Sequence, residues 1–364
     1  MGTNLDRCDL LIRGGQLIDG TGQAASLADI AVTGDRIVAV GALDVEKSEH
    51  EIDARGRVVA PGFIDVHTHD DRLVLSNPEV TPKLSQGVTS VVVGNCGISL
   101  SPWLGRRKPP PPLDLVFPPV IGDFTFPTFS AYAGSLARHH PAVNVAALIG
   151  HSTLRCAAME DLNRPARKEE IAVMKQHLRV SLAEGAAGFS TGLFYAPNKW
   201  APASEVEALA KELPAFQAVY ATHMRNEGER LFDSLDETFD TARRAGCSVV
   251  ISHHKCQTQE VWGRSDESLA RIEAASTEQP VAFDVYPYVA GSTVLLEEMI
   301  APSRRIIVSW SAAVPEAGGR DLADIAAEWV VQMPKQCSAC SPAGVFISVW
   351  TTQMWTGFFP IDSE

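Results

Sequence analysis

The stretch that decides the fold runs Pro61-Gly62-Phe63-Ile64-Asp65-Val66-His67-Thr68-His69. A short apolar, strand-like segment leads directly into two histidines that are separated by one residue. On an extended chain, residues i and i+2 point to the same side, so both imidazoles can reach one metal ion. The pair alone does not distinguish a metal site from two structural histidines, and the rest of the sequence has to decide.

Apolar strand-like segments recur along the chain and alternate with helix-like ones. The strand candidates are Val58–Val66, Val88–Gly94, Val143–Gly150, Ala186–Ser190, Val219–Thr222, Ser248–Ser252 and Val281–Tyr286. Helical periodicity is clear in Arg167–Leu182 and Ser204–Phe216, and Ser204 with Glu207 fits a capping box. This alternation predicts an α/β fold with a buried parallel sheet. We expect a TIM-like (β/α)8-type barrel that lacks its eighth unit.

The first 60 residues have a different pattern, with short β-branched runs between turn residues. Strands are predicted at Cys8–Arg13, which Gly14-Gly15 would end, at Asp29–Val32 and at Arg36–Val40. We therefore expect a small β domain over residues 1–60, a barrel over 61–329 with an insertion at 289–329, and a separate tail over 330–364.

Composition excludes several classes of protein. The net charge of −13 argues against nucleic acid as a partner. No apolar run approaches the roughly 20 residues of a membrane span, and Met1 to Gly15 lacks the features of a secretory signal. Seven scattered cysteines argue against a disulfide framework. We expect a monomeric cytoplasmic enzyme with reduced thiols.

Residues of metal-ligand type follow several of the later strand candidates. They are Cys96, His151, His223 and the adjacent pair His253 and His254. Imidazole and thiolate are suitable ligands for zinc. Each residue taken alone could be structural, but their shared placement at strand ends predicts a metal centre.

Several longer blocks resemble N-acyl-D-amino-acid deacylases, a family of the metal-dependent amidohydrolase superfamily. Besides residues 61–69, they are Gly94-Asn95-Cys96-Gly97-Ile98-Ser99, Gly150-His151-Ser152-Thr153-Leu154-Arg155, Tyr220-Ala221-Thr222-His223-Met224-Arg225-Asn226-Glu227-Gly228-Glu229, Ser252-His253-His254-Lys255 and Asp284-Val285-Tyr286-Pro287-Tyr288-Val289-Ala290-Gly291-Ser292-Thr293. The blocks occur in order between about residue 8 and Trp329. The resemblance implies an amidohydrolase barrel and zinc-dependent hydrolysis of N-acyl-D-amino acids to a D-amino acid and a carboxylate.

The resemblance also implies roles for individual residues. A tightly bound zinc would be held by Cys96, His223 and His253, with a second, weaker metal position at His67 and His69. His254 is the alternative to His253, which is preferred because it comes directly off its strand. The small-molecule substrate, an N-acyl-D-amino acid, would contact Lys255, Tyr286 and Ser292, and Phe194 and Tyr195 would form the wall beside its side chain.

The family pattern stops after Trp329. Residues 330–364 carry only Lys335, Asp362 and Glu364 as charges, and the Gly-Ser-Asp-Gly motif that supplies the family's catalytic aspartate is absent. No catalytic residue can therefore be assigned. Since the codons for residues 350–356, read two bases later, encode an acidic stretch like one of the family's, we hypothesise a frameshift near Trp329 followed by premature termination. The alternative is a natural divergent tail.

The leading interpretation of the activity is a deacylase that the missing motif impairs. One alternative is an inactive zinc-binding remnant, and another is an amidohydrolase acting on cyclic amides, against which Cys96 and residues 220–229 argue. Cys337 and Cys340 fall in the tail, where we expect no metal or redox role. We also expect Val345–Trp350 to lie in the barrel gap as a makeshift strand, and Leu11, Ile30 and Val38 to be partly uncovered.

Overall fold

A computed structural model describes residues 3–117, 124–300, 302–311, 313–329 and 346–350. The chain divides into two compact units, Met1–Phe63 and Ile64–Glu364. The remaining tail residues, with Cys337 and Cys340, lie outside the described part. No helix of the described residues is long and apolar enough to cross a membrane.

The first unit consists of β-strands, as the sequence predicts. They are β1 (Thr3–Leu5), β2 (Cys8–Leu17), β3 (Ser26–Thr33), β4 (Arg36–Gly41), β5 (Leu43–Val45), β6 (Ser48–Asp53) and β7 (Val58–Val59). One sheet has the order β4-β3-β2-β6 with β7 also on β2, and β1 pairs with β5.

Two expectations for this unit are wrong. Gly14-Gly15 does not end the first strand but forms an irregularity within β2, where the register against β3 shifts between Ile12 and Gly15. Gly14 has a φ of +66°, which only glycine adopts readily. Leu11 and Ile30 are both buried rather than uncovered, and Leu11 packs in a small core with Cys8. Val38 is 47% exposed, as expected.

The second unit is built on a seven-stranded sheet whose strands β9 to β14 are parallel. Its strands are β8 (Phe63–Asp65), β9 (Val88–Val93), β10 (Asn144–Gly150), β11 (Gly188–Gly192), β12 (Val219–His223), β13 (Val249–Ile251) and β14 (Val281–Phe283). They are ordered as in the chain, from β8 at one end to β14 at the other. The incomplete α/β barrel predicted from the sequence is therefore confirmed.

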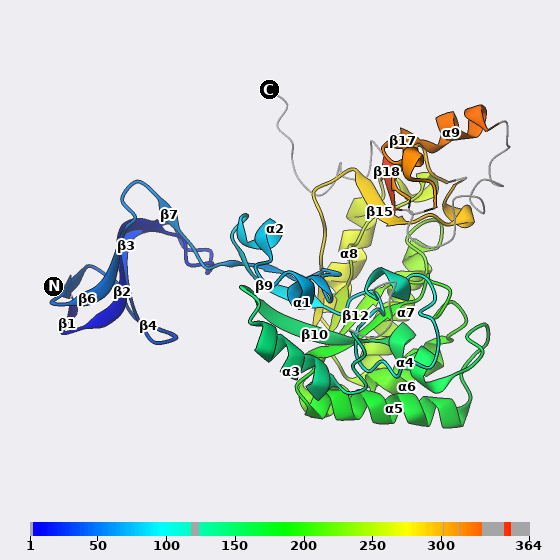
Figure 1. Ribbon diagram of the computed structural model, residues 1–364, viewed down its shortest axis with the longest axis horizontal. Coiled ribbons are helices and arrows are strands. Elements are labelled where there is room, and N and C mark those ends of the chain that lie inside the picture. Colours follow the sequence, from blue (N-terminus) through cyan, green and yellow to red (C-terminus); the bar gives the residue numbers. More distant parts are fainter. Residues whose placement is uncertain (1–2, 118–123, 301, 312, 330–345, 351–364) are drawn as a thin grey trace. The chain divides into compact units, whose positions relative to one another are not determined.

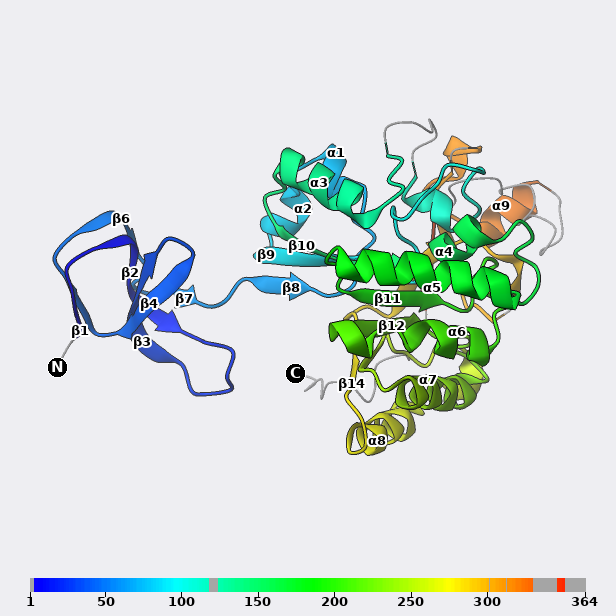
Figure 2. The same ribbon diagram turned by 90° about the horizontal axis from the view of Figure 1, so that it is seen from below.

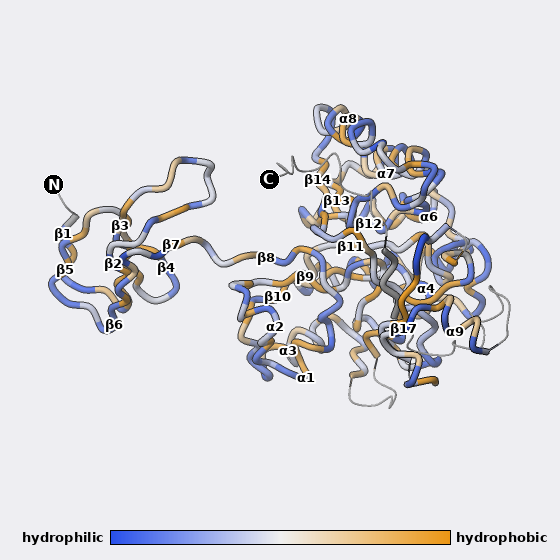
Figure 3. The backbone as a smooth tube through the Cα atoms, turned by 90° about the horizontal axis from the view of Figure 1, so that it is seen from above, coloured by the Kyte–Doolittle hydropathy of each residue, from blue (hydrophilic) through white to orange (hydrophobic). Residues whose placement is uncertain are grey.

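Helices connect the strands of this sheet. They are α1 (Leu73–Ser76), α2 (Thr81–Leu84), α3 (Phe129–His139), α4 (His151–Ala158), α5 (Lys168–Ala183), α6 (Ala203–Ala210), α7 (Leu231–Ala245) and α8 (Ser265–Ser276). Figure 2 shows α5, α6, α7 and α8 stacked beside the sheet in chain order. Hydrophobic stretches follow the strands, while hydrophobic and hydrophilic stretches alternate along the helices (Figure 3). The main core therefore lies between sheet and helices.

Proline accounts for two local departures from the predicted elements. The candidate Val58–Val66 is split into β7 and β8, because Pro61 lies between them and has no backbone N–H. Helix α6 starts at Ala203 with Pro202 as N-cap and without a side-chain cap. The capping box of Ser204 and Glu207 is therefore wrong, and the Glu207 carboxylate accepts a 2.6 Å bond from Lys211 Nζ instead.

A second, antiparallel sheet follows the parallel one. It has the order β15-β18-β16-β17 and consists of β15 (Ala290–Val294), β16 (Ile306–Trp310), β17 (Arg320–Asp321) and β18 (Phe346–Trp350), with α9 (Leu322–Glu328) beside it. Figure 1 shows β15, β17, β18 and α9 grouped together. The tail does form a strand, but β18 pairs with β15 and β16. The expectation that it fills the gap between β14 and β8 is therefore wrong.

Candidate metal centre

Cys96 lies on a tight turn after β9. Its φ is +53°, and the neighbouring Gly94 and Gly97 have φ values of +80° and +75°. Ser190 on β11 holds both sides of the turn, because its hydroxyl donates to Gly94 O and accepts from Gly97 N at 3.0 Å. The turn directs a buried thiol to the carboxyl ends of the parallel strands, where catalytic groups collect in such sheets.

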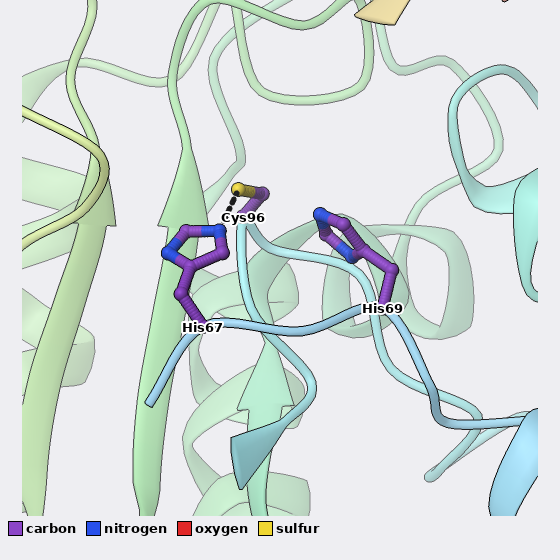
Figure 4. A group of neighbouring side chains, drawn as sticks. All are labelled: His67, His69 and Cys96. Atoms are coloured by element: carbon purple, nitrogen blue, oxygen red, sulfur yellow. Dashed lines mark hydrogen bonds between the residues drawn. The ribbon is translucent and has the colours of Figure 1, made fainter. Parts of the chain in front are cut away.

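The two histidines after β8 reach the same sulfur. His67 Nε2 lies 3.3 Å from Cys96 Sγ. Figure 4 shows the imidazoles of His67 and His69 on either side of that thiol, at the ends of a short extended segment. The ligand-type atoms of these three residues lie within 4.8 Å of one another.

A second set of ligand-type atoms shares the same cysteine. His223 is the last residue of β12, and His253 follows β13 with a φ of +37°. His253 Nε2 lies 3.5 Å from Cys96 Sγ, and the ligand atoms of Cys96, His223 and His253 lie within 4.8 Å of one another. His254 lies elsewhere, with its Nε2 2.9 Å from Ser268 Oγ. The geometry thus places His253, not His254, beside the thiol.

Two carboxylates surround these imidazoles and were missed by the sequence analysis. Glu227 Oε1 is 2.9 Å from His253 Nδ1. Asp284 accepts a 2.7 Å bond from His253 N and lies 3.3 Å from His67 Nδ1. Carboxylates on the outer nitrogen of metal-binding histidines fix the ring tautomer and orientation. Both residues lie within the blocks that carry the family resemblance, and this was the available signal.

The electrostatics of the centre suit a cation. Burial alone would raise the pKa of Cys96, but His67, together with His223 and His253, holds that pKa well below its ordinary value. A thiolate is the form that binds a metal. His223 Nδ1 is buried without a hydrogen-bond partner among the described residues. One sulfur and two or three imidazole nitrogens form a donor set typical of zinc.

A cavity of about 670 Å³ opens beside this centre and is lined by all five residues assigned to substrate contact. The ring of Phe194 stacks on His223 at 5.9 Å, and that of Tyr195 lies 4.8 Å from the same imidazole. Lys255, Tyr286 and Ser292 also face the cavity. The structure thus brings the ten predicted site residues together around one space.

His151 does not join the site, although it also follows a strand. It is fully buried at the start of α4, with its Nε2 3.0 Å from Glu205 Oε1. The same carboxylate binds the buried guanidinium of Arg155 and accepts a 3.0 Å bond from Ala166 N. Burial is the main cause that lowers the pKa of His151, because the charged imidazolium loses its contact with water. This histidine therefore belongs to a structural ion network.

Among the described residues, three carboxylates line the cavity, and each has partners. Asp65 binds Lys83 Nζ at 2.6 Å. Glu227 and Asp284 contact the histidines as described above. A general base must be free to take a proton from the attacking water, and these carboxylates are committed to other groups.

Comparisons with known proteins agree with this geometry. Residues 50–295 match the model of the amidohydrolase family. The chain is 48% identical over 320 residues to a D-aminoacylase from Alcaligenes xylosoxydans xylosoxydans; the match covers 88% of this chain and 66% of that protein. The chain thus spans about two thirds of the length of this relative.

Two solved structures are also similar. A crystal structure of D-aminoacylase superimposes with a TM-score of 0.89 at 45% identity, covering 95% of this chain and 72% of the other. N-acyl-D-glutamate deacylase from Bordetella bronchiseptica, in complex with zinc and a phosphonate inhibitor, gives 0.87 at 39% identity with the same coverage. The sequence, the fold and the convergence of one cysteine with histidines all agree with these matches. This chain therefore belongs to the amidohydrolase family, in the group of D-aminoacylase and the N-acyl-D-amino-acid deacylases.

Proposed function

We propose that this chain binds zinc through Cys96, His223 and His253, with a weaker second position at His67 and His69, and that the site acts on N-acyl-D-amino acids. The convergence of one thiol and two imidazoles within 4.8 Å, beside a cavity of substrate size, carries the proposal. Relatives that act on D-amino-acid derivatives, one of them crystallised with zinc, support the choice of metal and substrate.

The residues around the cavity have distinct tasks in this proposal. When bound, zinc supplies Lewis acidity that polarises a carbonyl group. Lys255 and Tyr286 would donate hydrogen bonds to the anionic and carbonyl oxygens of the substrate, and Ser292 would add a hydroxyl. The apolar rings of Phe194 and Tyr195 would contact the amino-acid side chain and favour neutral over acidic substrates.

We further propose that turnover is impaired. Amide hydrolysis needs a carboxylate that carries a proton from water to the leaving amine. The sequence lacks the family's aspartate motif, and the described carboxylates of the cavity are already paired. Residues of a catalytic unit act together, so an isolated metal site should give little rate. We also propose a monomeric cytoplasmic protein, in keeping with five described cysteines that are all buried and free.

The test combines metal analysis with an activity assay. We expect about one tightly bound zinc per chain in the wild type and much less in Cys96→Ser. Hydrolysis of N-acetyl-D-methionine should stay below about 1 per second, the low end of typical enzyme rates. Chains that bind no zinc would refute the metal proposal, and turnover within the range typical of enzymes would refute the impairment. N-acetyl-L-methionine is the control substrate, and hydrolysis of cyclic ureides alone would show that the substrate class is wrong.

A further inference from the structure

Nδ1 of His253 has two competing neighbours. Glu227 Oε1 and Lys255 Nζ each lie 2.9 Å from this nitrogen. Lys255 Nζ also donates to Glu227 Oε2 at 2.6 Å and to His253 O at 2.7 Å. Glu227 is 4% exposed and Lys255 6% exposed, so both charges are removed from water. The three side chains therefore form one buried cluster beside the candidate metal centre and the cavity, where Glu227 Oε2 also lies 3.7 Å from His223 Nε2.

The two contacts at Nδ1 require different tautomers of the imidazole. A neutral imidazole carries one N–H, so Nδ1 either donates to the Glu227 carboxylate or accepts from the Lys255 ammonium. His253 Nε2 faces Cys96 Sγ at 3.5 Å and is the nitrogen available to a metal. Nε2 has a free lone pair only when the proton is on Nδ1. Donation to Glu227 therefore permits metal binding, and acceptance from Lys255 prevents it.

We propose that Glu227 is a positioning residue that holds His253 in the metal-binding tautomer and that Lys255 is its competitor for Nδ1. This inference rests on the metal site proposed above and adds to it a choice between two states of one ligand. It also links the metal to the cavity. Once Nδ1 donates to Glu227, the ammonium proton that pointed at His253 can turn to an anionic group in the cavity that Lys255 lines.

The cluster makes an unusual prediction about paired substitutions. In Glu227→Ala, Lys255 stays buried 2.9 Å from Nδ1 without its counter-charge, and it holds the wrong tautomer beside a cation site. Removal of Lys255 as well should then restore part of the zinc affinity. If the ion pair only supported the fold, the double variant would regain stability over Glu227→Ala, because no buried charge is left without a partner, but the zinc affinity of the folded protein would not rise with it.

The experiment measures zinc affinity by competition with a chromogenic chelator, using the full chain with Glu227→Ala, Glu227→Gln, Lys255→Met and Glu227→Ala/Lys255→Met. Glu207→Ala is the matched control, because Glu207 also holds a lysine, Lys211, at 2.6 Å but on the surface of α6. Melting of the metal-free forms reports stability separately.

We expect Glu227→Ala to weaken zinc binding by about 10- to 100-fold, as outer partners of metal ligands typically do. The double variant should bind zinc more tightly than Glu227→Ala by between about 2- and 100-fold, the usual coupling of side chains in contact. Glu227→Gln should bind more tightly than Glu227→Ala, since its amide oxygen can accept from Nδ1. Glu207→Ala should behave as wild type.

Three results would overturn the inference. The first is a Glu227→Ala variant with wild-type zinc affinity, and the second is a double variant that binds zinc no more tightly than this single one. The third applies if Glu227→Ala does not fold, because Glu227→Gln and the double variant are then compared instead. In that case, a double variant whose zinc affinity is about 100-fold or more below that of Glu227→Gln refutes the competition. A wild type that binds no zinc refutes the metal proposal itself, so the two failures are distinguishable.

Discussion

Gly192→Ala tests whether the backbone of the strands sets the metal centre. Gly192 ends β11, and a Cβ built there would lie 2.2 Å from Cys96 O and 2.8 Å from Tyr195 Cδ2. The φ of Gly192 is not in the left-handed region, so alanine causes no backbone strain there and the added methyl acts only through its contacts. Cys96 carries the thiol shared by both sets of ligand atoms. One methyl group should therefore disturb the centre without removing any ligand.

The size of the effect follows from the geometry. The distance between the new Cβ and Cys96 O would have to increase by about 0.8 Å to reach 3.0 Å, because real Cβ atoms essentially never make shorter contacts. A backbone carbonyl cannot rotate away as the end of a flexible side chain can. Overpacking of this kind lowers the free energy of unfolding by about 1–3 kcal/mol. A shift near 1 Å in a preorganised site also weakens it, so we expect zinc affinity to fall by about tenfold or more.

Denaturant unfolding and chelator competition measure the two effects on the same protein. Gly134→Ala is the control, because it makes the same chemical change in the middle of α3, where the new Cβ would meet only the Arg138 guanidinium at 3.5 Å. In a helix this change should raise stability by about 0.5–1 kcal/mol. Wild-type stability and zinc affinity in Gly192→Ala would show that the turn carrying Cys96 is not held as described.

Further expectations concern ligands, acid and aggregation. His223→Ala should lower the zinc content more than His67→Ala, because His223 belongs to the tighter set; equal zinc retention by metal analysis would contradict the assignment. Glu205→Ala should lower the free energy of unfolding at pH 7 by about 3–5 kcal/mol, since it leaves buried Arg155 without a counter-charge. Burial alone would raise the pKa of Glu205, but His151 and Arg155 lower it from 4.5 to about 2. The ion network of Glu205 therefore contributes roughly 3 kcal/mol to the free energy of unfolding above about pH 4.5, and this contribution is lost as the pH falls toward 2. Denaturation curves of Glu205→Gln should not show this loss. Light scattering should show aggregation driven by the outer edges of β8 and β14, which pair with no other strand among the described residues, and a soluble monomer with a cooperative melting transition would contradict that expectation.

The strand pattern was readable from the sequence because central strands of a parallel sheet, such as β11 and β12, are buried on both faces, although β8 and β14 at its ends are largely exposed. Segments such as Val219–Thr222 are continuous apolar runs followed by a ligand-type residue, and the structure gives β12 as Val219–His223. The pairing of β18 could not be read in this way. An apolar five-residue segment fits any open sheet edge, and only the three-dimensional arrangement decides between the barrel gap and β15.

The residues of the candidate site were likewise only partly predictable from the sequence. Strand-end position identified Cys96, His223 and His253, but the same criterion also selected His151, whose neighbours in space are Glu205 and Arg155. Glu227 and Asp284 were not singled out because a carboxylate supports a histidine through a contact between strands, which sequence spacing does not encode. Position along the chain thus identifies candidates, and contacts in space decide which of them reach the site and what they do there.

Two of the proposed ligands have backbones that side-chain-bearing residues rarely adopt. Cys96 and His253 both have positive φ, and such strain amounts to about 1–3 kcal/mol per residue. Hydrogen bonds to neighbouring strands offset this strain: Ser190 accepts one at the Cys96 turn, and Asp284 accepts one from His253 N. The direction of the thiol and of the imidazole is therefore a property of the folded sheet. Because the sheet supplies that free energy, removing a ligand side chain should spare the fold and empty the site, whereas displacing the backbone at Gly192 should weaken both.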